Sequence, residues 1–425
     1  MRAIILVKER DFIFDKTKPL ALVKICGVPL IVRILNSIRA AGIKDVLILL
    51  GFNGEEIWSM LKDGGEIGLK LSYLKVGNHV SSLPKEFLDD DLLIISTDVV
   101  IDREFIDEII KTEGNVACYL NNRPFGVYKI TKECSKLLEN DLALNRVEEM
   151  LEKIEAMRNI KLDVSNMQVE HLELKRMVSP VCVKIENRRS IEFAKRKLVF
   201  RTQKGLHFTS YINKPIEDRV IYHMADVPWI TSNRITIFTN MTAFFVAALF
   251  LFGYMRIAAI LAYLVGILDG LDGKLARARG ILTKLGYIEH TFDMLYEQTW
   301  YVCFALGLYF SENNYLPLIL GLCLLLADGF VRHCYMQFKE TMGKALTAYT
   351  NFDRAFARVD GRRNVYVLYM IIFSWLDKPF YAMYAMLAHS SITAIVYAVR
   401  AFQHMSAADK AEGIKGFLKL VGGPS

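Results

Sequence analysis

Four acidic residues lie in the most apolar part of the sequence, within the stretch 269–293, which reads DGLDGKLARARGILTKLGYIEHTFD. Asp269 and Asp272 are three residues apart, and Glu289 and Asp293 are four residues apart. On a helix, each spacing places both side chains on one face, about one turn from each other. A carboxylate at the centre of a membrane helix costs roughly 2.5 to 3.5 kcal/mol, so four of them need cationic partners. We therefore expect a pair of divalent metal ions between two helices.

The neighbouring residues suit phosphoryl chemistry. Carboxylate oxygens are ligands for Mg²⁺ or Mn²⁺, and two such ions can clamp a pyrophosphate. Gly270, Gly273 and Ala276 are small enough to let a flat base or a ribose pass close to a helix. Arg277 can pair with a diphosphate oxygen in a forked geometry. A carboxylate that is not fully engaged by metal could take the proton from an attacking hydroxyl.

This run of residues resembles the signature of the CDP-alcohol phosphotransferases, two aspartates, a glycine, Ala-Arg, a second glycine and two further acids in fixed order. The flanking stretches YINKPIEDR and TSNRIT agree with it, so the resemblance covers roughly residues 205–400. It implies that an acceptor alcohol attacks the phosphorus of a CDP-alcohol and releases CMP. It also implies site roles: metal ligation by Asp269, Asp272, Glu289 and Asp293, general base catalysis by Asp293, and CDP binding by Gly273, Ala276, Arg277 and Gly286.

The sequence differs from the family signature in two ways near the third acid. Glu289 stands where the family has aspartate, and its spacing from Arg277 is one residue short. In the strict register, His290 and Met294 would take the two acidic positions. The preserved four-residue interval between Glu289 and Asp293 favours these two acids. His290 as a ligand is the alternative.

Long apolar segments after residue 230 predict an all-α polytopic membrane domain, which we bound at 233–425. We expect about six transmembrane helices, near 235–254, 257–278, 287–309, 315–336, 364–376 and 379–401. Residues 205–232 mix aromatic, basic and acidic side chains and predict an interfacial amphipathic juncture. The basic loops 277–284 and 332–363 fall on one side of the membrane, and the loops with few basic residues fall on the other. The positive-inside rule then predicts a multi-pass cell-membrane protein with its N-terminal domain and active site in the cytoplasm.

Basic residues cluster at the expected cytoplasmic mouth. Arg332, Arg358, Arg362 and Arg363 are candidates for binding the phosphate of an acceptor. Topology alone would also explain basic residues there. For Arg332, an internal ion pair with Asp328, four residues before it, is the favoured reading.

Residues 1–204 alternate apolar and charged stretches, as a globular domain does. The segments 1–7, 44–50 and 92–98 read as buried strands, and 29–41 has helical periodicity, which predicts a Rossmann-like α/β sheet. Asp98 ends the third strand, where ligands bind in open α/β sheets. A helix cap or turn is the alternative role for this residue.

The order of these pieces resembles the sugar-1-phosphate and alcohol-phosphate nucleotidyltransferases, through TKPLALVKICGVPLIVRIL and ISTD. The resemblance implies that Lys18 contacts phosphate, that Asp98 holds a magnesium ion and that Glu186 is a second metal acid. The fusion of both parts resembles the bifunctional inositol-1-phosphate cytidylyltransferase/di-myo-inositol-phosphate-phosphate synthase type.

The first loop departs from that family. It reads VKERDFIFDK and has no glycine, although only glycine lets backbone N–H groups approach nucleotide phosphates closely. Lys184 also stands where the family usually has an acid. These departures favour a degenerate domain kept for docking or regulation over an active cytidylyltransferase.

Composition limits the remaining function classes. The 425 residues are 53% hydrophobic, and their net charge of +7 fits basic loops near anionic lipid or phosphorylated substrates. The seven cysteines show no paired spacing and so suggest neither a zinc site nor a disulfide framework. We expect a CDP-alcohol donor, an alcohol or phosphorylated alcohol acceptor, a lipid membrane and a homodimeric partner, but no nucleic acid. A transporter or channel using the intramembrane acids, or a non-catalytic scaffold, is the alternative. The product, an inositol phosphodiester or a phospholipid, stays open.

Overall fold

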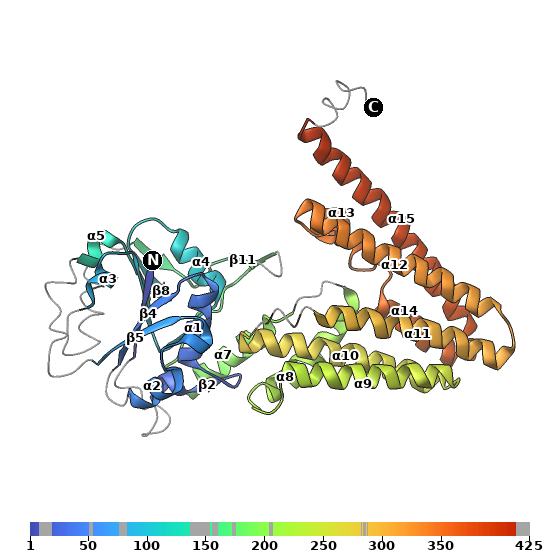
Figure 1. Cartoon of the computed structure of the whole chain (residues 1–425), viewed down its shortest axis with the longest axis horizontal. Coiled ribbons are helices and arrows are strands. Elements are labelled where there is room, and N and C mark those ends of the chain that lie inside the picture. The colour runs from blue at the N-terminus through green and yellow to red at the C-terminus, as the bar shows by residue number, and fades with distance from the viewer. Residues whose placement is uncertain are drawn as a thin grey trace. The chain divides into compact units, whose positions relative to one another are not determined.

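The chain folds into two compact units in the computed structural model (Figure 1). The α/β unit comprises Met1–Thr202, Ile221–Ile230 and Lys274–Leu282; the helical unit comprises Gln203–Val220, Thr231–Gly273 and Thr283–Ser425. The structure describes residues 1–7, 19–50, 54–75, 83–136, 154, 160–171, 176–203, 207–281, 283, 286 and 288–413. Each unit is described by itself below.

A seven-stranded mixed sheet forms the centre of the α/β unit, in the order β10-β8-β9-β6-β1-β4-β5. Strand β1 pairs in parallel with both β4 and β6, in the register Ile5↔Ile48 and Ile5↔Ile95. Apart from Arg2, Asp45 and Ser96 at their ends, these strands are apolar, because both faces of the sheet are covered. The strand bounds are β1 Arg2–Leu6, β4 Asp45–Leu50, β5 Lys70–Lys75, β6 Leu92–Ser96, β8 Val116–Leu120, β9 Arg123–Ile130 and β10 Ile160–Asp163.

The predicted strand–helix–strand unit is confirmed, because α1 connects β1 and β4 and buries Ile31, Ile34 and Ile38 in the core. The helices of this unit are α1 Leu30–Ala40, α2 Glu55–Leu61, α3 Lys85–Leu88, α4 Arg103–Lys111, α5 Lys132–Ser135 and α7 Arg188–Phe200. Short strand pairs complete it: β2 Lys24–Ile25 with β3 Val28–Pro29, β7 Val99–Val100 with β13 Val183–Lys184, and β11 Val169–His171 with β12 Arg176–Val178.

The helical unit contains helices at all the segments where spans are expected. Its long helices are α9 Ser232–Leu251, α10 Met255–Arg279, α11 Glu289–Glu312, α12 Leu316–Met342, α14 Arg363–Trp375 and α15 Phe380–Ala411. Helix α8 (Phe208–Met224) precedes them, and the turn η5 (Leu346–Ala348) and helix α13 (Asn351–Phe356) lie between α12 and α14. Helix α10 extends beyond this unit, since its last turns belong to the α/β unit.

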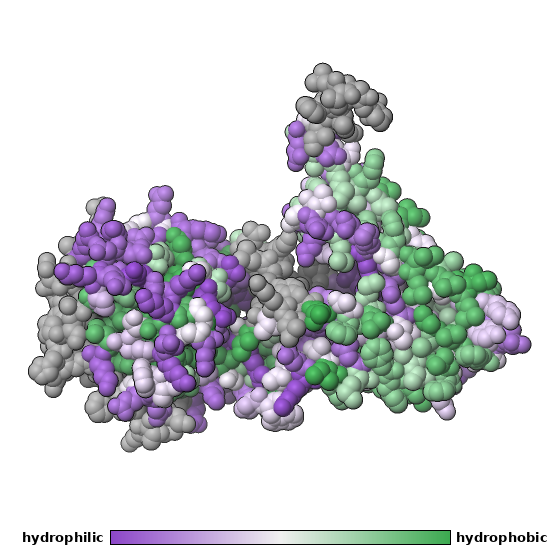
Figure 2. Space-filling view, in the orientation of Figure 1, coloured by the Kyte–Doolittle hydropathy of each residue, from purple (hydrophilic) through white to green (hydrophobic). Residues whose placement is uncertain are grey.

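The expectation of six spans is supported only in part. Among the helices that the structure describes, three are long and apolar enough to cross a membrane: α9, α12 and α15. Helices α10 and α11 carry the acidic stretch and its arginines, which lower their hydropathy, and α14 has only 13 residues. The apolar side chains nevertheless cover much of the visible face of this unit, whereas the visible face of the α/β unit is mainly hydrophilic (Figure 2).

Close packing between α9 and α11 fixes the helical core. Trp300 is fully buried, and its indole N–H donates to the carbonyl oxygen of Ala243 at 2.7 Å. At Gly307, an added Cβ would lie 2.1 Å from the backbone oxygen of Phe250. Small residues permit this kind of close backbone approach between membrane helices. A glycine is therefore required where these two helices cross.

Candidate functional site

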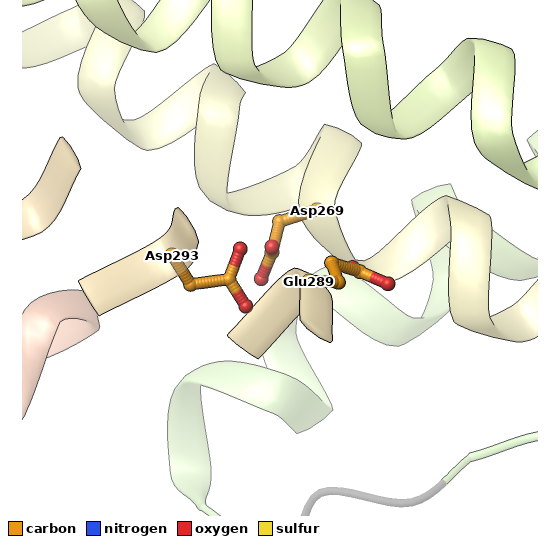
Figure 3. Close-up of side chains that lie close together, drawn as sticks. All are labelled: Asp269, Glu289 and Asp293. Carbon is orange, nitrogen blue, oxygen red and sulfur yellow. The ribbon is translucent and has the colours of Figure 1, made fainter. Parts of the chain in front are cut away.

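Three of the predicted acids converge between α10 and α11. Asp269, Glu289 and Asp293 each offer one carboxylate oxygen, and these three atoms lie within 4.8 Å of one another. The carboxylates of Asp269 and Asp293 face each other across the space between the helices (Figure 3). All three side chains are half-buried. Glu289 and Asp293 are one turn apart at the start of α11, so both side chains lie on the same face of that helix, as their spacing in the sequence predicts.

Asp272, the fourth predicted acid, lies in the same helix as Asp269 and is held from two sides. The hydroxyl of Thr236, on α9, donates to its Oδ2 at 2.6 Å, and the side chain of Glu289 forms a hydrogen bond with it. Asp272 is 2% exposed, so its carboxylate is one of the most buried acids in the site. The backbone N–H of Gly273 donates to its other oxygen. Thr236 is a contact that the sequence reasoning missed, although it lies in the recognised TSNRIT stretch.

Glu289, not His290, belongs to the acidic group. The His290 side chain is 67% exposed, and its Nδ1 lies 3.3 Å from Oδ2 of Asp293 at the edge of the group. Position 290 is offset by one residue, or about 100°, from the helix face that carries positions 289 and 293. The two acids that are four residues apart, Glu289 and Asp293, are therefore the ones that lie next to Asp269.

Arg363 links the acids to α14. Its Nη2 donates to Oδ2 of Asp269 at 2.7 Å, and its Nη1 lies 3.0 Å from a carboxylate oxygen of Glu297. Nη1 also donates to the hydroxyl of Tyr296, which in turn lies 3.4 Å from Asp269. The guanidinium is therefore fixed between two carboxylates and a phenol.

Glu297 is a site residue that the sequence reasoning missed. It lies on α11 one turn beyond Asp293, so that positions 289, 293 and 297 carry acids at four-residue intervals on one helix face. Glu297 is 5% exposed and bridges two arginines, because Arg332 also donates to it. Arg332 donates in addition to Asp328 at 2.7 Å, the internal ion pair that the sequence favoured.

The donor set suits a hard divalent cation. Three carboxylate oxygens lie close enough to surround one ion, and the group contains neither sulfur nor, in its inner part, an imidazole. Such all-oxygen sites bind Mg²⁺, Mn²⁺ or Ca²⁺ in preference to soft metals. These carboxylates repel one another at this separation, and a cation would remove that repulsion. The residues present therefore fit a divalent metal.

The residues expected to bind CDP are found on α10 and just after it. The Nε of Arg277 donates to the carbonyl oxygen of Thr202 at 2.8 Å, so one of its donors is used within the α/β unit. Ala276 is half-buried, and Gly286 is exposed with its N–H on the hydroxyl of Thr283 at 3.2 Å.

The small residue Gly270 has a different role from the one expected of small residues in this stretch. A Cβ at this position would lie 2.7 Å from a carboxylate oxygen of Glu217 on α8. Glu217 is 5% exposed. The face of Gly270 is thus covered by a buried glutamate of α8 and is not open to a base or ribose.

The other candidate arginines differ in their surroundings. Arg362 donates to Asp360 at 2.6 Å, whereas Arg358 is exposed. Asp360 also accepts from the hydroxyl of Tyr397 at 2.5 Å and lies 3.9 Å from Nε2 of His207. Burial lowers the pKa of His207 to about 4; Arg362 acts in the same direction and Asp360 opposes it. His207 is therefore neutral at pH 7 and serves as a buried packing and hydrogen-bonding group.

In the α/β unit, two of the three candidate residues lie on adjacent chain segments. Asp98 is 5% exposed and follows β6, and its carbonyl oxygen accepts from the N–H of Ile185 at 2.7 Å. Glu186 is the next residue after Ile185 and is exposed. Lys18 and the glycine-free loop lie outside the described residues, and Lys184 donates to the carbonyl oxygen of Pro124 at 2.7 Å.

Known proteins are similar to both parts of the chain. The bifunctional IPC transferase and DIPP synthase of Aquifex aeolicus (strain VF5) is 23% identical over 297 residues, 63% of this chain and 67% of that protein. The protein of the same name from Thermococcus kodakarensis is 23% identical over 381 residues, 84% of this chain and 86% of that protein. The low-salt glycan biosynthesis nucleotidyltransferase Agl11 of Haloferax volcanii is 30% identical over 105 residues, 23% of this chain and 29% of that protein.

The acidic site lies inside a segment that matches a described family. Residues 229–397, which include α9 to α14 and most of α15, match the CDP-alcohol phosphatidyltransferases. This match contains Asp269, Asp272, Glu289 and Asp293. The resemblance inferred from the acidic signature is confirmed, because residues 229–397 form a CDP-alcohol phosphatidyltransferase domain.

Proposed function

We propose that the acids of α10 and α11 are the active site of a membrane CDP-alcohol phosphotransferase. The observation that carries this proposal is the convergence of Asp269, Glu289 and Asp293 within 4.8 Å, inside the segment that matches the family. A transporter or a scaffold would not require this combination of acid geometry and signature.

In the proposed reaction, the acceptor hydroxyl attacks the phosphorus that carries the alcohol of the CDP-alcohol. Asp293 takes the hydroxyl proton as the new O–P bond forms. The bond from that phosphorus to the oxygen of the CMP phosphate breaks, and CMP leaves with the electron pair. Bound divalent cations would supply charge neutralisation for the diphosphate. Arg277 would bind a diphosphate oxygen.

Charge balance supports two Mg²⁺ or Mn²⁺ ions. The contacts described above join six carboxylates and two guanidiniums, those of Asp269, Asp272, Glu289, Asp293, Glu297, Asp328, Arg332 and Arg363. When all six carboxyl groups are ionised, four negative charges are uncompensated within this set, and two divalent cations would neutralise them. Unneutralised charge of this size is costly in a largely buried site. Asp269, Asp272, Glu289 and Asp293 are the proposed ligands.

For the substrate class, we propose CDP-inositol as the donor and a phosphorylated inositol as the acceptor. Support comes from the two relatives named bifunctional IPC transferase and DIPP synthase, one of which aligns with 84% of this chain. The anionic acceptor phosphate would be bound at the mouth by Arg358 and Arg362, whereas Arg332 and Arg363 are held by carboxylates. Phospholipid synthesis, with a lipid-linked CDP-alcohol, is the second candidate, since the acidic signature contacts the CDP end of the donor.

A panel assay separates these two products. We expect purified full-length protein in detergent with Mg²⁺ to release CMP from CDP-inositol when a phosphorylated inositol is added. CMP release should be at least about tenfold slower with CDP-diacylglycerol and any of the same acceptors, a difference of about 1.4 kcal/mol in the barrier. CMP release from CDP-diacylglycerol alone would contradict the inositol assignment, and no CMP from any donor would contradict the enzymatic function.

We further propose that all six long helices are embedded in a cell membrane, with the acids at the cytoplasmic side and the juncture 205–232 at the headgroup layer. The basic loops at 277–284 and 332–363 support this orientation. Helix α8 supports the juncture, because Tyr211, Ile212 and Ile216 are exposed along it. A homodimer in the membrane is part of the same proposal and follows from the family resemblance.

We propose that the α/β unit has lost cytidylyltransferase activity. Residues 7–16 lack the glycines that a backbone phosphate cradle needs, although Asp98 and Glu186 lie on adjacent segments. We expect no pyrophosphate release from CTP with inositol 1-phosphate in a coupled phosphate assay. CMP release from added CDP-inositol by the same preparation is the control for folded protein. Pyrophosphate release would instead show an active cytidylyltransferase that binds phosphate through side chains.

A further inference from the structure

The carboxylate of Asp269 is shared between the proposed metal site and a built-in cation. Oδ2 of Asp269 accepts from Arg363 at 2.7 Å, and an oxygen of the same carboxylate belongs to the group with Glu289 and Asp293. Arg363 is 11% exposed and cannot turn toward water without leaving its partners. Its positive charge therefore lies where a metal ion would also place positive charge.

Glu297 is the group that restrains this arginine from the other side. Its Oε1 lies 3.0 Å from Nη1 of Arg363, and its Oε2 accepts from Arg332. Arg332 is itself held by Asp328 at 2.7 Å. Glu297 is thus oriented by one arginine and orients the other. Its own side chain is 7% exposed, so its charge is weakly screened by water.

From this arrangement we infer that Arg363 competes with the divalent metal for the carboxylate of Asp269. Glu297 is a positioning residue that determines how strongly Arg363 pairs with Asp269. Glu297 attracts the guanidinium of Arg363 and so weakens its pairing with Asp269, which leaves the Asp269 carboxylate able to bind an ion. Without the Glu297 charge, Arg363 pairs more fully with Asp269 and the ion is bound more weakly. Without the Arg363 charge, the ion is bound more tightly.

The two changes have opposite signs, which a merely structural role would not produce. Disturbed packing at either position would weaken metal binding in both variants. A charge change in a site of low dielectric alters binding by amounts of the order of tenfold or more. The inference rests on the proposed metal site and extends it to residues on α11 and α14 outside the acidic signature.

The test is a titration of the full-length protein in detergent with Mn²⁺, in which free Mn²⁺ is measured by electron paramagnetic resonance. We expect Glu297→Gln to raise the Mn²⁺ dissociation constant about tenfold and Arg363→Gln to lower it about tenfold. Glu297→Asp keeps the charge and should lie between the wild type and Glu297→Gln. Glu312→Gln, an exposed acid at the end of the same helix, is the matched control and should bind Mn²⁺ as the wild type does.

The outcomes separate the inference from the metal site itself. Opposite shifts in the two glutamine variants support the competition. Shifts in the same direction, or an unchanged dissociation constant in Glu297→Gln, would overturn it while the metal site stands. A wild-type protein that binds no Mn²⁺ would overturn both. Size-exclusion chromatography of each variant identifies misfolded protein before the titration.

Discussion

Asp293→Asn should reduce CMP release by about 10³-fold, the range expected for loss of a general base. The amide keeps the shape of the side chain and one oxygen ligand but cannot accept the proton of the acceptor hydroxyl. The turnover number should therefore fall much more than the affinity for the CDP-alcohol changes. The measurement is CMP release at saturating donor and acceptor, compared with donor binding in the absence of an acceptor.

The neighbouring histidine offers a matched control for this result. His290 contacts Asp293 from the exposed side at 3.3 Å, and its replacement by glutamine should leave CMP release within about twofold of wild type. If His290→Gln were the inactive variant and Asp293→Asn the active one, the register with His290 as ligand would be correct. CMP release at the wild-type rate by Asp293→Asn would alone contradict its role as base.

Asp269→Asn should abolish CMP release to within the detection limit, a loss of about 10³-fold or more. This residue contributes an oxygen to the carboxylate group and is also the partner of Arg363, so its loss affects both. Removal of metal from wild-type protein with EDTA should give the same loss, and added Mg²⁺ should restore the activity of the wild type alone. The assay is again CMP release, with and without the chelator.

Thermal unfolding provides a second measurement for the same variant. An ion that binds only the folded protein at 100 times its dissociation constant stabilises it by about 2.7 kcal/mol. Mg²⁺ should therefore raise the Tm of the wild type and have little effect on Asp269→Asn. An Asp269→Asn variant that Mg²⁺ stabilises as much as the wild type would show that Asp269 is not a ligand.

Short-range patterns predicted the elements of the fold better than they predicted the contacts. The apolar run of β1 and the periodicity of α1 were read correctly because both depend on neighbouring residues. Hydropathy was less reliable for α10 and α11, whose charged residues bring their composition below that of ordinary spans. These two helices contain both apolar and charged residues because the acids of the candidate site lie on them.

Long-range partners of the acids could not be read from the sequence. Arg363 is 94 residues from Asp269, and no local pattern connects a residue at the start of α14 with one in α10. Glu297 is a different case, since acids at 289, 293 and 297 show a regular spacing of four. The spacing is a local signal, although the family signature ends at Asp293, one helical turn before Glu297.

The close contact at Gly307, toward the C-terminal end of α11, affects the position of the acids at the start of the same helix. Gly307 lies 14 residues from Asp293, or about 21 Å along the helix. Any side chain there would push α11 away from the backbone of Phe250 and tilt the whole helix. At the opposite end, such a tilt would change the separation between the carboxylates of Asp293 and Asp269. The separation of these two carboxylates thus depends on a residue about four helical turns away from them.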